Sequence, residues 1–249
     1  MKLLFLFLVI STFSFTISPK EVVAIGDKIW KNECGATLEG LVYWNKAEEF
    51  PSLGIGHFIW FPEGYRGPFE ETFPSLLQFL QKEGAVFPSW LSKHLEKKSS
   101  APWSSYEDFL EKKKSPEVES LRKMLFETRG LQALFIAKRL ERAAFQIQGK
   151  EQIYRNLQKL LENPKSLYAV IDYVNFKGTG LSSSEAYKGQ GWGLVHVLER
   201  ISESSLDILE DFVKEAKKIL LLRVQNAPKE RGEDRWLKGW YNRLDSYLL

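Results

Sequence analysis

From residue 70 onward, apolar residues recur at three- and four-residue intervals, which is the spacing that places them on one face of a helix. The pattern is fullest in 129–147, where Leu134, Ile136 and Leu140 belong to a broad apolar face typical of a central buried helix. A similar repeat runs through 21–33. The expected later helices span 70–83, 89–97, 104–113, 117–127, 129–147, 150–162, 165–176, 190–201, 205–225 and 230–248.

One stretch, 41–61, departs from the helical pattern. Its apolar residues form two short runs, 42–44 (Val-Tyr-Trp) and 58–60 (Phe-Ile-Trp), and polar residues lie between them. Short β-forming runs on both sides of turns are typical of a small antiparallel β-element. The sequence predicts strands only here, so the expected fold class is mainly α, an α+β arrangement with a small β-hairpin.

Cys34 is the single cysteine among 249 residues, so no intramolecular disulfide can form and packing must hold the fold together. A chain of this length with 44% hydrophobic residues can bury a substantial core. No stretch is long enough to be a linker between domains. We therefore expect one domain over 19–249, with a helix and hairpin part (19–68) and a helical part (69–249).

The first eighteen residues have the pattern of an export signal. Lys2 precedes an apolar run from Leu3 to Ile17, which is short for a membrane span. Because no Ala-x-Ala sequence marks a cleavage site, both cleavage near residue 18 and a retained anchor stay open. The sequence therefore predicts export to the periplasm or the extracellular space.

Several classes of function have no support in the sequence. Lys and Arg total 35 against 32 Asp and Glu, a formal charge of +3, which does not provide the extended basic surface that nucleic acid demands. The three histidines are scattered, and neither zinc-type spacing nor a nucleotide-binding glycine motif occurs. We expect no nucleic-acid partner, no metal and no cofactor.

The end of the first helix and the β-element form the most specific part of the sequence. Glu33 ends the helix, 43–45 (Tyr-Trp-Asn) follows, and 52–57 (Ser-Leu-Gly-Ile-Gly-His) completes the series. Residues 30–60 resemble the phage-type lysozymes, glycoside hydrolase family 24, in which a catalytic Glu closes a helix and a hairpin with Thr-Ile-Gly-x-Gly-His follows. Segment 236–243 is loosely similar to their closing helices. The resemblance implies a lysozyme-like fold that cleaves amino-sugar glycosidic bonds.

Glycoside hydrolysis requires a protonated carboxyl that assists the leaving oxygen, with a base or nucleophile across the cleft. The resemblance assigns the acid to Glu33, whose protonated form would be favoured by partial desolvation at the helix end. The family hairpin carries an Asp where this chain has Asn45, and an amide cannot act as a base. Glu48 is our choice for the second carboxylate, and Glu49 is a nearly equal alternative. A solvated turn is the competing interpretation of both.

The rest of the hairpin motif predicts supporting roles. Ser52 stands where the family has a Thr that positions the attacking water, and a serine hydroxyl can form the same hydrogen bond. Gly54 and Gly56 would let the backbone approach the sugar or the catalytic helix. The resemblance implies that His57 is structural, since its counterpart hydrogen-bonds or ion-pairs beneath the hairpin. The expected substrate side of the hairpin thus comprises Asn45, Gly54, Gly56 and His57.

A second stretch, 172–195, is dense in amide, aromatic and glycine residues. We expect it to form the opposite wall of the cleft, where amides bind N-acetyl or hydroxyl groups and rings stack on sugar faces. The residues predicted for this wall are Asn175, Tyr187, Gln190 and Trp192. Segment 193–196 (Gly-Leu-Val-His) is faintly similar to a Gly-Leu-Met-Gln stretch of lytic transglycosylases, which makes Glu185 the alternative acid. A glycine-rich turn between helices is the competing interpretation.

These observations predict an exported glycosidase that acts on peptidoglycan or a related amino-sugar polymer. Glu33 would be its general acid. Two alternatives remain open. In the first, the chain is a catalytically inactive carbohydrate-binding or cell-envelope protein on the same fold, an alternative that the missing hairpin Asp favours. In the second, it is an enzyme similar to the lytic transglycosylases.

Overall fold

The computed structural model describes residues 17–67, 69–97 and 100–249, so nearly all of the expected export signal, 1–18, lies outside the described residues. The described residues form eleven α-helices and two small antiparallel sheets. This confirms the mainly helical class and the small β-element. No described helix is both long and apolar enough to span a bilayer.

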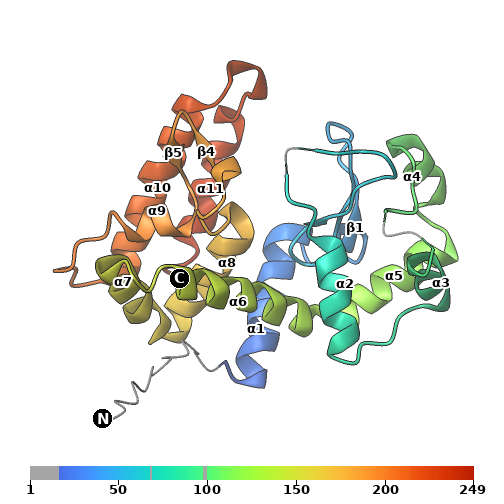
Figure 1. Cartoon of the computed structure of the whole chain (residues 1–249), viewed down its shortest axis with the longest axis horizontal. Helices are drawn as coiled ribbons and strands as arrows, with labels where there is room; N and C mark the ends of the chain where they lie inside the picture. The colour runs from blue at the N-terminus through green and yellow to red at the C-terminus, as the bar shows by residue number, and fades with distance from the viewer. Residues whose placement is uncertain (1–16, 68, 98–99) are drawn as a thin grey trace, which may run out of the picture.

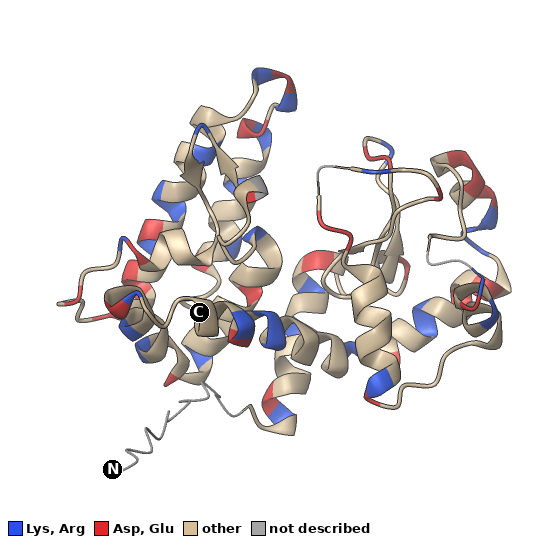
Figure 2. Cartoon of the chain, in the orientation of Figure 1, with Lys and Arg blue, Asp and Glu red and all other residues tan. Residues whose placement is uncertain are grey.

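Figure 1 shows two lobes that are joined by α1 (Pro19–Cys34) and α6 (Arg129–Gln146). The sheet lobe contains η1 (Glu39–Leu41), β1 (Val42–Tyr43), β2 (Ser52–Leu53), β3 (Phe58–Ile59), α2 (Phe73–Lys82), α3 (Ser89–Leu95), α4 (Tyr106–Lys112) and α5 (Pro116–Glu127). The helical lobe contains α7 (Glu151–Leu161), α8 (Pro164–Lys177), η2 (Ser183–Glu185), β4 (Ala186–Tyr187), β5 (Gln190–Gly191), α9 (Leu194–Leu198), α10 (Ile208–Asn226), η3 (Lys229–Arg231) and α11 (Asp234–Asp245). Acidic and basic residues are interspersed over both lobes (Figure 2).

Both ends of α1 are set by local sequence. A capping box starts the helix, because the Ser18 hydroxyl accepts a hydrogen bond from the Glu21 backbone N–H and the Glu21 carboxylate accepts one from Ser18. Gly35 ends it in the left-handed region at φ 58°, which glycine adopts without a Cβ penalty. Glu33 is thereby placed in the last turn of α1.

The core runs without a break through both lobes. Buried apolar side chains from the sheet lobe, from α6 and from the helical lobe form one connected cluster. The side chains of Ile136 and Leu140 on α6 are fully buried, as the broad apolar face of 129–147 predicts. Helix α1 packs closely on α6 at Gly26, where a Cβ would lie 2.9 Å from the Arg129 carbonyl oxygen. The two helices therefore hold the lobes in a defined relation.

The strand prediction was incomplete. The first sheet has three strands in the order β1-β2-β3, and a second hairpin, β4–β5, occupies part of the segment predicted to be a helix from 190. Lys188 and Gly189 have φ values of 49° and 78°, as a two-residue hairpin turn requires. Helix α9 is accordingly shorter than predicted and begins at Leu194. Strands of two residues are too short to produce a readable alternation.

His196 makes the stability of the fold depend on pH. Its ring packs against the backbone beneath the second hairpin, where a Cβ on Gly180 would lie 2.8 Å from Nδ1. Burial lowers the pKa of His196 below its ordinary value of 6.5. The unfolded chain therefore binds a proton at a pH at which the folded chain does not, and the free energy of unfolding falls as the pH drops below about 6.5. Urea titrations between pH 7.5 and 5 measure this slope. Replacing His196 with Gln should reduce it, and an unchanged slope in the variant would contradict this origin.

Candidate active site

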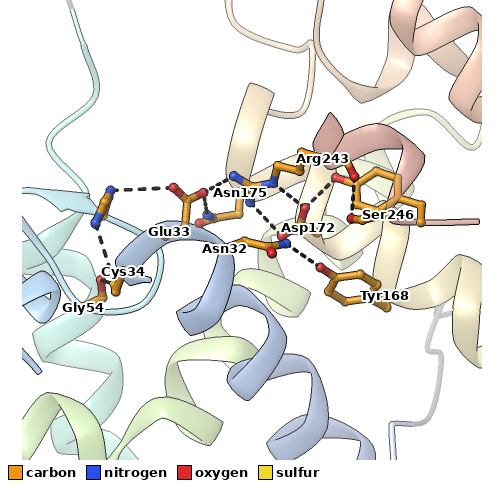
Figure 3. A network of polar contacts seen from close by, with 11 residues as sticks. Asn32, Glu33, Cys34, Gly54, Tyr168, Asp172, Asn175, Arg243 and Ser246 are labelled. Atoms are coloured by element: carbon orange, nitrogen blue, oxygen red, sulfur yellow. Dashed lines mark hydrogen bonds and ion pairs between the residues drawn. The ribbon is translucent and has the colours of Figure 1, made fainter. Parts of the chain in front are cut away.

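Glu33 lies where the two lobes meet, and three elements hold its carboxylate (Figure 3). Its Oε1 accepts hydrogen bonds from Arg243 Nη1 of α11 at 2.6 Å and from Asn175 Nδ2 of α8 at 3.2 Å. His57 Nδ1, from the turn after β2, approaches Oε2 at 3.6 Å. The Glu33 side chain remains 17% exposed. The carboxylate is thus held in place and still reachable from solvent.

The charge of Arg243 is shared between two carboxylates. Its Nε and Nη2 each donate to Asp172 at 2.7 Å, and its third nitrogen donates to Glu33. Asp172 is fully buried and also accepts a hydrogen bond from the Tyr247 hydroxyl at 2.5 Å. Burial alone disfavours the guanidinium, but Asp172 and Glu33 raise the pKa of Arg243 well above its ordinary value. The Arg243 guanidinium therefore forms ion pairs with two carboxylates, those of Asp172 and Glu33.

Helix α8 supplies three members of this network from one face. Tyr168, Asp172 and Asn175 are spaced by four and three residues, which places them in register along a helix. The Tyr168 hydroxyl accepts a hydrogen bond from Asn32 Nδ2 of α1 at 2.8 Å. We therefore define the Glu33 network as Asn32, Glu33, His57, Tyr168, Asp172, Asn175, Arg243 and Tyr247. The 168-172-175 spacing is a sequence pattern that our sequence analysis missed.

Neutral groups fix the turn 54–57 against the end of α1. The Cys34 thiol lies 3.6 Å from the Gly54 carbonyl oxygen and 3.7 Å from His57 Nε2. Burial raises the pKa of Cys34 to about 12, so the thiol stays protonated at neutral pH. Burial also lowers the pKa of His57, although the charge of Glu33 opposes that effect. His57 is therefore a neutral contact between the turn and Glu33, in keeping with the structural role that the resemblance implies.

A buried amide attaches the same turn to α6. Gln132 is fully buried, and its Oε1 accepts a hydrogen bond from the Ile55 backbone N–H at 2.9 Å. Its Nε2 donates to the Leu125 carbonyl oxygen at 2.6 Å and to the Thr128 hydroxyl at 3.0 Å. Gly54, at φ 72°, leaves the space that Gln132 Oε1 needs. Gln132 lies four residues before Ile136, on the apolar face predicted for 129–147, and this position is the sequence signal for its burial.

Gly56 is required for the contact between the turn and α8. A Cβ at this position would lie 2.5 Å from Asn175 Oδ1 and 2.7 Å from Phe58 Cζ. We expect Gly56→Ala to lower the free energy of unfolding by about 1–3 kcal/mol, the usual cost of overpacking, as measured by urea denaturation. Gly239→Ala is the matched control, because Gly239 lies in α11 where a Cβ would meet no atom within 4 Å. The control should gain about 0.5–1 kcal/mol from helix propensity, and equal losses in both variants would contradict the close approach.

The expected second carboxylate, Glu48, lies in the loop between β1 and β2, and no described hydrogen bond or ion pair joins it to Glu33. Asn45, Glu48 and Glu49 are exposed in this loop, which lies at the end of the strands opposite the 54–57 turn. Trp44 Nε1 donates to the Glu48 carbonyl oxygen at 2.8 Å and holds the loop against the sheet lobe. Among the described residues, it is Asp172, rather than Glu48, that shares an ionic partner with Glu33.

Ser52 lies in the middle strand of the first sheet and is 9% exposed. It pairs with Tyr43 on one side and Ile59 on the other, so it lies on the sheet face opposite the buried Leu53 row. No described hydrogen bond joins its hydroxyl to the Glu33 network. The structure therefore places Ser52 on the expected element.

The predicted facing wall is present only in part. Asn175 contacts Glu33, whereas Trp192 is 6% exposed and the Arg223 guanidinium lies 4.2 Å from the centre of its ring system. The Tyr187 hydroxyl donates to the buried Glu233 at 2.9 Å. Gln190 donates to the Gly191 carbonyl and accepts from Arg200. These three side chains are already engaged within the fold, and the Trp192 ring has no open face for a sugar.

Glu185, the alternative acid, belongs to the second hairpin. Its carboxylate lies against Gly178 and accepts a hydrogen bond from the Gly180 backbone N–H. Burial raises the pKa of Glu185, and the charge of Arg139 partly offsets this. No described hydrogen bond or ion pair connects it with the Glu33 network, so the two acids occupy separate environments.

Comparisons of the chain with family models, with curated proteins and with solved structures found no match in any of the three. Among the described residues, no group of three or more His, Cys, Asp or Glu side chains is placed to hold a metal ion. The Glu33 network offers one partly exposed carboxyl that is positioned by a guanidinium, an amide and a neutral imidazole.

Proposed function

We propose that this chain is an exported, lysozyme-like glycosidase that cleaves an amino-sugar polymer, most directly peptidoglycan, with Glu33 as its general acid. The observation that carries the proposal is the place of Glu33, in the last turn of α1 between the Gly-Ile-Gly-His turn and α8. A helix-end acid beside such a turn is the arrangement that the resemblance to family 24 implies. Its partial exposure would allow a glycosidic oxygen to approach.

The hydrogen bonds to Glu33 favour a particular site for the donated proton. Both strong donors, Arg243 and Asn175, bind Oε1. Oε2 is left with the approach of the neutral His57 at 3.6 Å, which is too long for a hydrogen bond. A proton on Oε2 therefore disrupts no described hydrogen bond.

Arg243 is shared unequally between the two acids. Asp172 is fully buried and accepts three hydrogen bonds, two of them from the guanidinium. Glu33 is more exposed and accepts only one bond from the guanidinium. Asp172 is thus the main counterion of Arg243, and Glu33 is the more exposed of the two carboxylates.

A second group for the reaction is harder to assign, and this favours a single-acid mechanism similar to that of the lytic transglycosylases. In that route the substrate supplies the nucleophile: one of its own hydroxyl oxygens bonds to the anomeric carbon. The glycosidic oxygen departs with the proton of Glu33, the hydroxyl proton passes to water, and the product is an anhydro-sugar. Asn45, which stands where the family hairpin carries an Asp, supports this alternative over a two-carboxylate hydrolysis.

The other alternative is a catalytically inactive carbohydrate-binding or cell-envelope protein. It is supported by the same ion pair between Glu33 and Arg243, which serves equally well as a structural link between α1 and α11. Such a protein would bind the polymer through this junction without breaking it.

Incubation of the purified chain with peptidoglycan separates these possibilities. Soluble fragments with new reducing ends indicate hydrolysis, and fragments lighter by one water indicate anhydro-sugar formation, as read by mass spectrometry. Sedimentation of the chain with the polymer, without any release of fragments, would identify the inactive binding protein and overturn the proposed enzyme.

A further inference from the structure

His57 faces Glu33 with a ring nitrogen that accepts no described hydrogen bond. This nitrogen, Nδ1, lies 3.6 Å from Glu33 Oε2, and the two side chains are 29% and 17% exposed. Neither atom is among the enclosed polar atoms of the described residues that lack a hydrogen-bond partner, so both keep some surface exposed to solvent. We propose that His57 is the second catalytic group of this site, a general base that takes the proton of the attacking hydroxyl on Nδ1. The inference rests on the proposed function, in which His57 replaces water as the acceptor of that proton.

The other side of the ring determines which nitrogen carries the proton. Cys34 Sγ donates to the Gly54 carbonyl oxygen at 3.6 Å, and this contact uses the single proton of the thiol. His57 Nε2 lies 3.7 Å from the same sulfur, so it meets a sulfur lone pair and supplies the hydrogen itself. A neutral imidazole with its proton on Nε2 has a lone pair on Nδ1. The ring therefore presents an acceptor on the side of Glu33.

The groups around the ring favour its neutral form. Burial lowers the pKa of His57, and the Arg243 guanidinium acts in the same direction. The charge of Glu33 and a backbone contact with Gly40 oppose this, each by less than burial contributes. Cys34 faces the ring as an uncharged thiol. At neutral pH the ring is thus able to accept a proton, as a general base must be.

The backbone of His57 has a conformation that is uncommon for a residue with a side chain. Its φ is 49°, in the left-handed region. Residues other than glycine cost free energy there, and they concentrate at functional sites, where the surrounding structure holds them in place. A glycine at this position would avoid the cost but would carry no base. The conformation therefore supports a role for the ring beyond packing.

The proposed step balances between the two residues. A hydroxyl oxygen of the substrate bonds to the anomeric carbon, and its proton passes to His57 Nδ1. The glycosidic bond breaks, and the leaving oxygen takes the proton of Glu33. The products of the step are an imidazolium and a carboxylate whose facing atoms, Nδ1 and Oε2, lie 3.6 Å apart in the structure. Return of the proton from Nδ1 to Oε2 restores both groups for the next turnover.

Nitrogen-15 NMR of the histidine rings tests the tautomer on the full chain, independently of activity. At neutral pH the His57 ring, assigned by the loss of its signals in His57→Asn, should carry its proton on Nε2. A proton on Nδ1 would overturn the proposal, because that nitrogen would then have no lone pair to offer. The same signals followed against pH give the titration of the ring. Turnover should fall toward acid pH along that titration, since a protonated ring cannot act as a base.

His57→Asn should lower the turnover of peptidoglycan by about 10²- to 10⁴-fold, the range typical of losing a general base. Asparagine tolerates the left-handed region and its amide takes up no proton, so the variant should keep its fold by circular dichroism. His94→Asn is the matched control, because His94 lies on α3 and its Nε2 contacts the Ser100 carbonyl oxygen, and it should retain turnover. In His57→Gly, added imidazoles should restore part of the turnover, and the more basic ones should restore more. A merely structural role would not produce this dependence on basicity.

Failure of the base is distinguishable from failure of the proposed function. Unchanged turnover in a folded His57→Asn chain, or rescue of His57→Gly that does not depend on the basicity of the imidazole, would overturn the base and leave Glu33 as the acid. A parent chain that releases no fragments from peptidoglycan would overturn the proposed function and the base with it.

Discussion

Replacing Glu33 with Gln should reduce the turnover of peptidoglycan by about 10²- to 10⁴-fold, the range typical of losing a general acid. The amide has the shape of the carboxyl, and its oxygen can still accept from Arg243 and Asn175. Its NH₂ group would face the neutral ring of His57. The variant should therefore fold normally, as circular dichroism and urea denaturation would show, while it is unable to protonate the leaving oxygen.

Glu185→Gln is the matched control for this experiment, because Glu185 is also half-buried and was the alternative acid. Its carboxylate has no described hydrogen bond or ion pair with the Glu33 network, so we expect only a small loss of turnover. Full activity in a folded Glu33→Gln protein would remove Glu33 from the mechanism. A large loss in Glu185→Gln alone would move the acid to the second hairpin and favour the transglycosylase-like alternative.

The largest effect on stability is expected at Asp172. Asp172→Asn should lower the free energy of unfolding by about 3–5 kcal/mol, because removing one partner of a buried ion pair leaves the other charge uncompensated. The variant amide would turn an N–H donor toward the donors of Arg243 or the Tyr247 hydroxyl. Urea denaturation followed by far-UV circular dichroism measures the change.

Asp245→Asn makes the same chemical change in an exposed ion pair. Asp245 and Lys217 form a surface contact in which their side chains are 53% and 29% exposed. Pairs of this kind contribute about 0–1 kcal/mol, so the control should be nearly as stable as the parent chain. Comparable losses of unfolding free energy in both variants would show that burial does not determine how much the Asp172 ion pair contributes to stability.

Local patterns predicted most of the helices and the first sheet. The apolar repeats of 129–147 and 165–176 matched α6 and α8 closely, since side chains three and four residues apart meet on a helix whatever surrounds it. The hairpin in 186–191 was not predicted, because a periodic pattern needs more residues than its strands contain. Its two-residue strands carry no periodicity, and the hairpin depends on the turn at Lys188 and Gly189.

By itself, the sequence determined that Glu33 ends a helix and that a glycine turn follows within about twenty residues, because capping and turn formation act over a few neighbouring positions. Only the tertiary structure decided what Glu33 contacts. Asn175 and Arg243 are 142 and 210 residues away along the chain, and the packing of α8 and α11 against α1 brings them together. It also decided how the Glu48 loop is held, through the hydrogen bond from Trp44 Nε1 to the Glu48 carbonyl oxygen. Contacts across such separations depend on the whole core, which no local pattern encodes.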